Sequence, residues 1–298
     1  LLGSTILGFH TRYHCKNFIE TVDRNLEART EHEHSTITVN KQTTLIESYP
    51  ISIAWPTDEA RGAWPSVAVC RSAVRNRLGL PAEHKLAVGV DRFDYTKGIL
   101  ERIHAVERML EKYPQFVGRF SLIQVAAPSR SDLDEYKSFQ LRIRQVTDRV
   151  NARFGRPGCL AVYLLAEHHE HEAVTELYRA ADVCVVTSLH DGMNLVCKEF
   201  VAARDDEQGV LLLSRFAGAA AELNEALIVN PYHVEEGADV LHRAITMPAS
   251  EQRERMSNMR MTVRDYNVYR WAGRMLADAA RWRLRERIEA RMLRHTRD

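Results

Sequence analysis

The sequence predicts an α/β protein with a doubly wound parallel sheet. From about residue 84 onward, short β-rich runs alternate with stretches of helical periodicity. The strand-like runs are rich in Val, Ile and Leu and show no polar alternation, which is typical of parallel strands that helices cover on both faces. The length of 298 residues suits one large α/β domain or two ordinary ones.

The predicted sheet begins with a strand at residues 86–90, and the helix that follows has apolar residues at the spacing of one face over 99–110. The next helix has a capping-box start at Ser131 and Asp134. Further strands are predicted at residues 120–125, 161–165, 183–187, 209–213 and 226–229. Further helices are predicted at residues 171–181, 194–204 and 216–224.

The chain before residue 84 follows a different pattern. It predicts a helix at about residues 11–26, a polar stretch at 27–40, and strand-like runs at 43–47 and 50–53. We expect too few strands here for a separate sheet. A proline-containing connector follows, with one short helix near residues 67–78, and the chain from about residue 251 is predicted to be long and helical.

The composition excludes several classes of protein. The 41 Lys and Arg face 40 Asp and Glu, a formal net charge of +1, which argues against a generally basic nucleic-acid binder. No window has the roughly 20 apolar residues of a membrane span. Leu1 opens an apolar run without a leader, which we interpret as an internal start. The five cysteines form no C-x-x-C pair, so we expect a protein of the reducing cytoplasm.

Two cations follow the first predicted strand of the sheet. Arg92 and Lys97 stand between the end of that strand and the start of a helix, where backbone N–H groups and the helix dipole favour an anion. A phosphate or diphosphate is the natural ligand, although neither G-x-x-x-x-G-K-[ST] nor G-x-G-x-x-G is present. The alternative is that both cations only pair with Asp91 and Asp94.

Two carboxylates follow the strand predicted at residues 183–187. Gly192 permits a tight turn after Asp191, and Asn194 is a suitable helix cap. If the helix begins near Gly192, Glu199 lies about two turns further on and both carboxylates project to one side. Such a pair suits the hydroxyls of a sugar nucleotide better than a metal, whose ligands must converge. The alternative is a coincidence of two surface acids.

At this point several long segments resemble the signatures of trehalose-6-phosphate synthases. The resemblance extends in order from Gly8 to about Trp271. The segments that carry it are V-D-R-F-D-Y-T-K-G at residues 90–98, D-G-M-N-L-V at 191–196, E-F-V-A-A-R at 199–204, F-A-G-A-A at 216–220 and L-I-V-N-P-Y at 227–232.

The resemblance implies a retaining glycosyltransferase of the GT-B type, in which two Rossmann-like domains face each other. This family transfers glucose from UDP-glucose to glucose 6-phosphate, without a metal or other cofactor, and no protein nucleophile is implied. The resemblance also implies that this chain divides into four segments. They are residues 1–55 as the end of the N-terminal, acceptor-side domain, 56–83 as a connector, 84–255 as the complete donor-binding domain and 256–298 as a C-terminal helical segment.

The family's residue roles carry over position by position. Arg92 and Lys97 match the pair that holds the donor diphosphate and stabilises the departing UDP. Asp191 matches the carboxylate that holds the hydroxyls of the donor glucose, and Glu199 the acid that binds the ribose. The backbone of the segment after Asp191 would lie against the sugar and diphosphate: Gly192, Met193, Asn194, Leu195 and Val196.

Arg130 matches a basic residue that helps to bind the acceptor phosphate, and its alternative is an arginine paired with Asp132 or Asp134. Ser188-Leu189-His190 departs from the Pro-Leu-Arg of many relatives, so that His190 stands at the position of their arginine. The family's glycine-rich donor loop, acceptor-binding residues and cleft histidine would all lie upstream of Leu1. We therefore expect the isolated chain to be incomplete for turnover.

The resemblance implies UDP-glucose and glucose 6-phosphate as small-molecule partners, with no nucleic acid and no membrane. It also leaves room for a homo-oligomer and for a trehalose-phosphate phosphatase as a partner. Two other functions stay open: a glucosylglycerol-phosphate synthase that uses ADP-glucose and glycerol 3-phosphate, and a non-catalytic nucleotide-sugar-binding module. The His-rich stretches at residues 31–34 and 167–172 contain no H-E-x-x-H and no cysteine at zinc spacing, so we expect no metal site.

Overall fold

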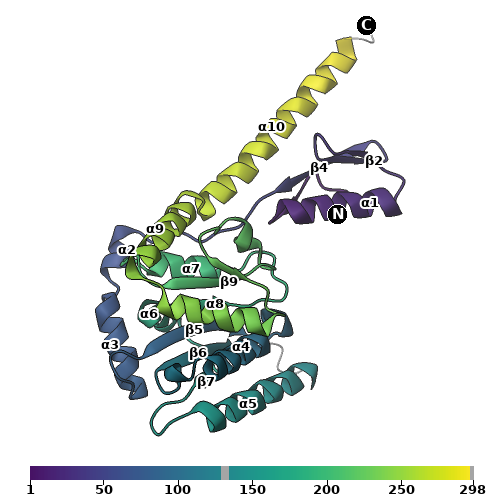
Figure 1. Cartoon of the computed structure of the whole chain (residues 1–298). Helices are drawn as coiled ribbons and strands as arrows, with labels where there is room; N and C mark the ends of the chain where they lie inside the picture. The colour runs from purple at the N-terminus through teal and green to yellow at the C-terminus, as the bar shows by residue number, and fades with distance from the viewer. Residues whose placement is uncertain (129–133, 296–298) are drawn as a thin grey trace. The chain divides into compact units, whose positions relative to one another are not determined.

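The computed structural model describes residues 1–128 and 134–295, and the chain divides into two compact units. The larger unit is Trp55–Arg264, and the smaller unit combines Leu1–Ala54 with Asp265–Asp298. Figure 1 shows the elements of both units along the chain. The C-terminal helical segment was expected to begin at residue 256, but the larger unit extends to Arg264.

A six-stranded parallel sheet forms the centre of the larger unit, in the order β10-β9-β8-β5-β6-β7. Its strands are β5 (Lys85–Arg92), β6 (Phe120–Ala127), β7 (Val162–Leu165), β8 (Val183–Val186), β9 (Val210–Ser214) and β10 (Leu227–Val229). The chain runs outward from β5 to β7, returns to the other side of β5 and continues outward from β8 to β10. The predicted doubly wound parallel sheet is confirmed, with every strand predicted after residue 84.

Helices cover both faces of this sheet. On one face α4 contacts both α5 and α8, and on the other α6 contacts both α3 and α7. Their bounds are α3 (Val67–Leu78), α4 (Ile99–Lys112), α5 (Asp134–Phe154), α6 (His171–Ala180), α7 (Val196–Ala203) and α8 (Val234–Thr246). The short α2 (Asp58–Gly62) precedes α3, and α9 (Ala249–Asp265) follows α8.

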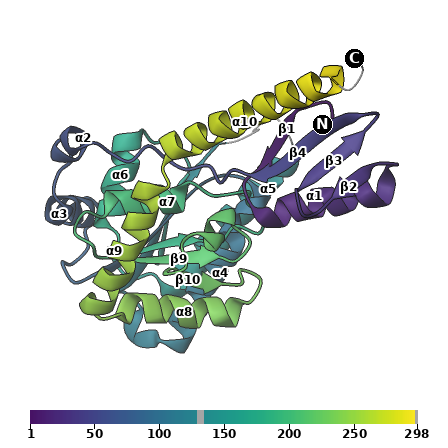
Figure 2. The same cartoon turned by 90° about the horizontal axis from the view of Figure 1, so that it is seen from above.

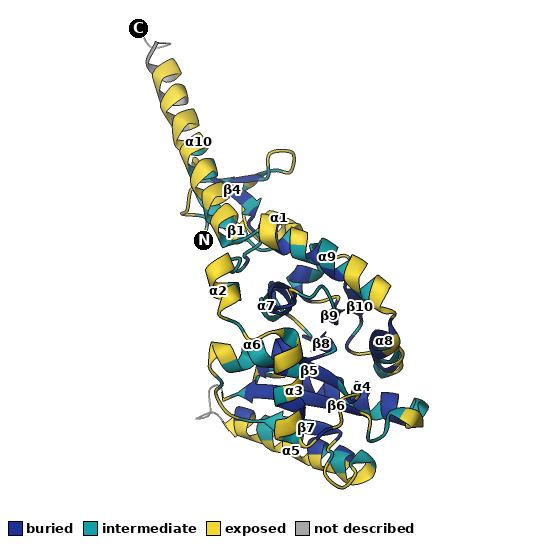
Figure 3. Ribbon diagram, turned by 90° about the vertical axis from the view of Figure 1, so that its left-hand side faces the viewer, coloured by how far each residue is buried: buried dark blue, intermediate teal, exposed yellow. Residues whose placement is uncertain are grey.

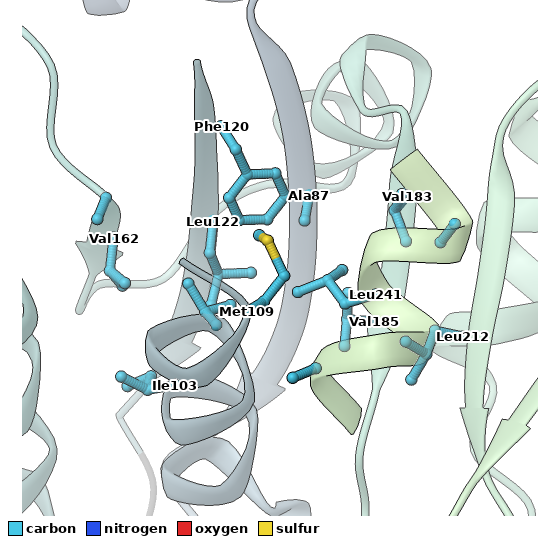
Figure 4. Close-up of a cluster of buried hydrophobic side chains, with 14 of the residues drawn as sticks. Ala87, Ile103, Met109, Phe120, Leu122, Val162, Val183, Val185, Leu212 and Leu241 are labelled. Carbon is cyan, nitrogen blue, oxygen red and sulfur yellow. The ribbon is translucent and has the colours of Figure 1, made fainter. Parts of the chain in front are cut away.

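The core lies between the sheet and the helices α4, α5 and α8. Figure 3 shows the buried strands of this sheet, and Figure 4 shows Met109 of α4 beside Phe120 and Leu122 of β6. Both β6 side chains are almost fully buried. Cutting back one such side chain to Ala typically costs about 2–5 kcal/mol, so this core holds the carboxyl ends of the strands in a fixed arrangement.

Three local features of the larger unit differ from the predictions or were absent from them. α7 begins at Val196, two residues after the predicted start at residue 194 and four after the Gly192 start on which the two-turn spacing to Glu199 depended. The helix expected at 216–224 is only the 3₁₀ turn Gly218–Ala221, because the N–H groups of Gly218 and Ala219 donate to the carbonyls of Asp191 and Met193. Helices α2 and α8 were not among the predicted elements.

The smaller unit contains a four-stranded sheet, in the order β1-β4-β3-β2 (Figure 2). β1 pairs parallel to β4, and β3 pairs antiparallel to both β4 and β2. The strands are β1 (Ile6–Phe9), β2 (Arg29–Glu31), β3 (Thr36–Val39) and β4 (Gln42–Ser48). α1 (Arg12–Asn25) buries Ile19 and Val22 in a cluster with Ile37 and Ile46.

The expectation of too few strands for a separate sheet was therefore wrong. Two strands lie in the stretch predicted to be polar at residues 27–40, where tertiary pairing outweighs a weak local signal, and residues 50–53 form no strand. The predicted long C-terminal helix is interrupted near residue 266, where α9 ends and α10 (Val268–His295) begins. α10 joins the smaller unit through Trp271 Nε1, which donates to the Tyr49 carbonyl at 3.2 Å.

Among the described residues, no helix is long and apolar enough to span a membrane. All five cysteines are free thiols, and Cys184 is fully buried in β8.

Candidate functional site

The topological switch point of the larger sheet lies between β5 and β8. These strands are neighbours, but the chain continues from them toward opposite edges of the sheet. They pair only at Ala87↔Val183 and Val88↔Cys184, so they separate toward their carboxyl ends. In open parallel sheets, ligands bind beyond the carboxyl ends of the strands at such a point. The loops that leave β5 and β8 therefore form the candidate site.

Lys97 and Asp191, which come from these two loops, form an ion pair. Lys97 Nζ lies 2.7 Å from Asp191 Oδ2, and the two side chains are 20% and 13% exposed. Burial raises the pKa of Asp191, but the hydrogen bond and charge of Lys97 outweigh it with help from Asn194 and Met193, so the pKa lies below its usual range. Asp191 is thus an ionised acceptor in a partly buried position.

The Asp191 carboxylate has further donors within its own loop. Asn194 Nδ2 lies 3.2 Å and Ser188 Oγ 3.4 Å from Oδ2, and the Met193 N–H lies 3.4 Å from Oδ1. Asn194 has φ 72°, and its Oδ1 accepts from the Cys197 N–H at 3.1 Å. The N-cap residue of α7 is Leu195, so Asn194 accepts from the first turn of the helix from one position before the N-cap, and the same side chain donates to Asp191.

Two glycines let the loops of the site pack backbone against backbone. Gly98 has φ +63°, and a Cβ built on it would lie 2.0 Å from the Thr187 carbonyl oxygen. A Cβ on Gly218 would lie 2.0 Å from the Gly192 carbonyl oxygen. The Leu189 N–H also donates to the Thr96 carbonyl at 2.7 Å. The loops after β5, β8 and β9 are therefore held together without intervening side chains.

Arg92 is exposed at the end of β5, and its guanidinium makes no hydrogen bond or ion pair with any residue that the structure describes. The alternative pairing with Asp91 and Asp94 is wrong for both cations. Asp91 is buried against Arg102, and Asp94 accepts from the N–H and hydroxyl of Thr96 at 2.9 and 2.7 Å. Arg92 and Lys97 thus present positive charge at the switch point.

Glu199 lies in the first turn of α7, where the helix dipole favours an anion. Its Oε2 accepts from the Tyr178 hydroxyl at 3.2 Å. Burial raises the pKa of Tyr178 well above its usual value, and the charge of Glu199 adds to this effect, so Tyr178 stays a donor. The prediction that about two helical turns separate Asp191 from Glu199 was wrong, because α7 begins only at Val196. Asp191 and Glu199 therefore have different partners, Lys97 and Tyr178, and are held in place independently.

The remaining predicted positions are mostly in the same loop. Met193 is buried, Gly192, Leu195 and Val196 are half-buried, and His190 is exposed. Arg130, the predicted acceptor-phosphate residue, lies outside the described residues, as does the capping-box residue Ser131. No group of three or more potential metal ligands occurs within residues 1–128 and 134–295.

Two buried cations near the site were missed by the sequence reasoning. Arg102 Nη1 lies 2.6 Å from Asp91 Oδ2, and Lys198 Nζ lies 2.7 Å from Glu222 Oε2. Arg102 stands between apolar residues on the buried stripe of α4, three positions after Ile99. The sequence did contain a signal for Arg102, since a charged residue on the buried face of a helix needs a partner inside the protein.

Comparison with known proteins places these observations in a family context. The model of "Glycosyltransferase family 20" matches residues 1–281. The chain is 34% identical over 288 residues to an α,α-trehalose-phosphate synthase (UDP-forming) of Pichia angusta, covering 94% of this chain and 58% of the relative. It is 37% identical over 277 residues to a trehalose-6-phosphate synthase of Enterobacter sp. (strain 638), covering 93% and 57%.

Solved structures show the same likeness. An α,α-trehalose-phosphate synthase of Burkholderia xenovorans in complex with glucose-6-phosphate matches with a TM-score of 0.84 and 34% identity, over 93% of this chain and 61% of that one. The E. coli protein bound with UDP-2-fluoro glucose matches with a TM-score of 0.86 and 34% identity, also over 93% and 61%. The chain therefore has the fold of the corresponding part of these proteins and spans about three fifths of their length.

Proposed function

Because the chain belongs to glycosyltransferase family 20, we propose that it provides the donor-binding part of a retaining glucosyltransferase that forms trehalose 6-phosphate from UDP-glucose and glucose 6-phosphate. The activity for which its relatives are named and the ligands in two similar structures support this proposal. The observation that carries it in this chain is the Lys97–Asp191 pair at the switch point. Arg92 at the end of β5 adds a guanidinium that makes no hydrogen bond or ion pair with the described residues.

In the proposed complex, Arg92 and Lys97 bind the diphosphate of UDP-glucose. Lys97 then shares its charge between the diphosphate and Asp191, whose carboxylate accepts hydrogen bonds from hydroxyls of the donor glucose. Glu199 binds the ribose, and the backbone of residues 192–196 lies against the sugar and diphosphate. Arg130 contributes to the acceptor phosphate site.

The transfer exchanges one bond at C1 of glucose for another. The bond from C1 to the diphosphate oxygen breaks, and the acceptor hydroxyl oxygen attacks C1 from the same face, which retains the configuration. The hydroxyl proton passes to the departing phosphate oxygen. Arg92 and Lys97 stabilise the negative charge that develops on UDP, so the proposed reaction needs neither a protein nucleophile nor a metal or other cofactor.

This function places the protein in the cytoplasm, where the nucleotide sugar and free thiols are found. It gives the protein no nucleic-acid or membrane partner, and its small-molecule partners are the two substrates. A second copy of the chain and a trehalose-phosphate phosphatase that consumes the product are the macromolecular partners it would use. Since the chain spans about three fifths of its relatives, we propose that it binds the donor alone with little turnover.

The test is calorimetry of the 298-residue chain with UDP. We expect weak, saturable binding by the wild type and about tenfold weaker but still measurable binding by Lys97→Ala. Lys112→Ala is the matched control, because Lys112 lies at the opposite end of α4 and pairs with Asp239 and Glu235 on the surface. No heat with UDP at millimolar concentration would contradict the proposed donor site.

A product assay separates the remaining functions. If the coding sequence extends upstream of Leu1, the longer protein is assayed with UDP-glucose and ADP-glucose against glucose 6-phosphate and glycerol 3-phosphate. Trehalose 6-phosphate as the product supports the proposal, whereas glucosylglycerol phosphate alone would replace it. UDP binding with no transfer by the longer protein would identify a non-catalytic nucleotide-sugar-binding module.

A further inference from the structure

Arg102 of α4 is a buried guanidinium at the switch point, only 1% exposed. It lies in the first turns of the helix that follows the Lys97 loop. None of the residue roles proposed above involves it. Its contacts join three strands of the larger sheet to that loop.

The guanidinium binds one residue on each of three strands or their extensions. Nη1 donates to Asp91 Oδ2 of β5 at 2.6 Å and to Gln124 Oε1 of β6 at 2.7 Å. Nε donates to the hydroxyl of Thr187, the residue after β8, at 3.1 Å. Because β5 and β8 share backbone pairs at only two positions, the Arg102 side chain links them where the strand ladder has ended.

The backbone of β5 is shaped to admit this side chain. A Cβ on Gly89 would lie 2.2 Å from Arg102 Nη1 and 2.8 Å from Gln124 Oε1. Nη2 has no hydrogen-bond partner among the described residues. A buried ion pair with an unsatisfied donor adds little net stability compared with apolar packing, so the geometric effect of Arg102 is its main contribution.

A relay runs from Arg102 to the Lys97 loop. The Thr187 hydroxyl accepts from Arg102 Nε, so its own hydrogen is directed to the Gly98 carbonyl at 2.8 Å. Gly98 directly follows Lys97 and packs its Cα against the Thr187 carbonyl. Thr187 is also the first residue of the loop that leads to Asp191. Arg102 thus fixes the two loops relative to each other at the point where Lys97 meets Asp191.

We propose that Arg102 is a positioning residue that sets the placement of Lys97 for a nucleoside diphosphate. This inference rests on the proposed function, since it requires Lys97 to contact the diphosphate. Arg102 itself lies too deeply to touch a ligand. Its effect must therefore pass through Lys97, and that dependence can be measured.

The experiment is a double-mutant cycle on UDP binding, measured by calorimetry with the 298-residue chain. Arg102→Lys keeps the charge but loses the fork of donors, and we expect it to weaken UDP binding about tenfold. In the Lys97→Ala background, the same change should alter the residual affinity by less than about twofold. Equal factors in both backgrounds, or no effect of Arg102→Lys on the wild type, would overturn the inference.

Two further variants separate positioning from folding. Thr187→Val removes the relay hydroxyl and leaves the buried ion pair, so we expect UDP binding about three- to fivefold weaker. Its unfolding temperature should fall as well, because Arg102 Nε and the Gly98 carbonyl lose their partner; unchanged affinity would contradict the relay. Arg204→Lys is the matched control, because Arg204 is also fully buried but pairs with Asp206 at 2.9 Å. Its UDP affinity should equal that of the wild type, and an equal loss would mark the Arg102 effect as general destabilisation.

The two proposals fail in different ways. If the wild-type chain does not bind UDP, both are overturned. If it binds UDP and Lys97→Ala weakens that binding, but the cycle is additive, only the role of Arg102 is overturned.

Discussion

The larger sheet has a carboxylate that pairs with basic residues at the amino ends of its strands and another at their carboxyl ends, but the two arrangements differ. At the amino ends of the strands, Asp182 accepts from Arg71 at 3.0 Å, from Arg75 at 3.3 Å and from the Leu86 N–H at 2.9 Å. At the carboxyl ends, Asp191 pairs with a single cation among the described residues, Lys97, and Arg92 at the end of β5 has no partner among those residues.

The difference separates a structural cluster from a binding site. Arg75 also donates twice to the His84 carbonyl and is 6% exposed, so its charge is fully used inside the protein. Lys97 and Arg92 keep donors that can turn to an incoming anion. A charged cluster at the amino end of this sheet should therefore govern stability, and the one at the carboxyl end should govern ligand binding. Four predictions test this division, the largest expected effect first.

Asp182→Ala should destabilise the fold by about 3–5 kcal/mol, because it leaves Arg75 buried without its carboxylate. Urea unfolding of the variant and the wild type measures this change. UDP affinity of the folded variant should stay within about twofold of the wild type, since Asp182 lies at the far end of the strands from the site. A large loss of UDP affinity would remove the distinction between the two ends.

Lys97→Ala should show the opposite behaviour. In the catalytically complete protein we expect turnover to fall by about a hundredfold or more, as is common when one preorganised charge at a developing anion is lost. Its unfolding free energy should fall less than in Asp182→Ala, by about 1–3 kcal/mol, because Asp191 keeps its donors Ser188, Met193 and Asn194. Steady-state kinetics and urea unfolding measure the two effects, and an unchanged turnover would exclude Lys97 from the mechanism.

Gly218→Ala should separate the loops of the carboxyl end. Its Cβ would lie 2.0 Å from a backbone oxygen that has no flexible side chain to yield, so we expect a cost of about 1–3 kcal/mol and weaker UDP binding. Gly62→Ala is the control, because a Cβ there meets nothing within 4 Å. Calorimetry and thermal unfolding of both variants test this prediction; equal behaviour of the two would contradict the close packing.

The smallest effect concerns pH. The pKa of Asp191 is lowered in the folded protein, so its pair contributes stability above the unfolded carboxyl pKa of about 3.9 and loses it as the pH falls through the folded value. The difference in unfolding free energy between the wild type and Asp191→Asn should be constant from about pH 8 to pH 5 and shrink below about pH 4. A difference that grows on acidification would show that the sign is wrong.

Local patterns predicted the elements of the larger unit well. The apolar runs of β5 to β10 and the apolar stripe of α4 are short-range patterns. The two loops with Arg92, Lys97 and Asp191 could likewise be recognised from residues that directly follow the strands. The smaller unit was predicted less well. Its strands β2 and β3 are polar and short, and their pairing depends on β4, which lies further along the chain.

By itself, the sequence determined the parallel α/β architecture and the positions of charged residues just after the strands, because both depend on neighbouring residues. Only the tertiary structure decided that β5 and β8 lie side by side, which joins Lys97 to Asp191. It also decided that the N–H groups of Gly218 and Ala219 donate to another loop rather than within a helix, and that Arg102 lies buried between strands. These features depend on contacts between residues far apart in the chain, whose energies exceed the local preferences at each position.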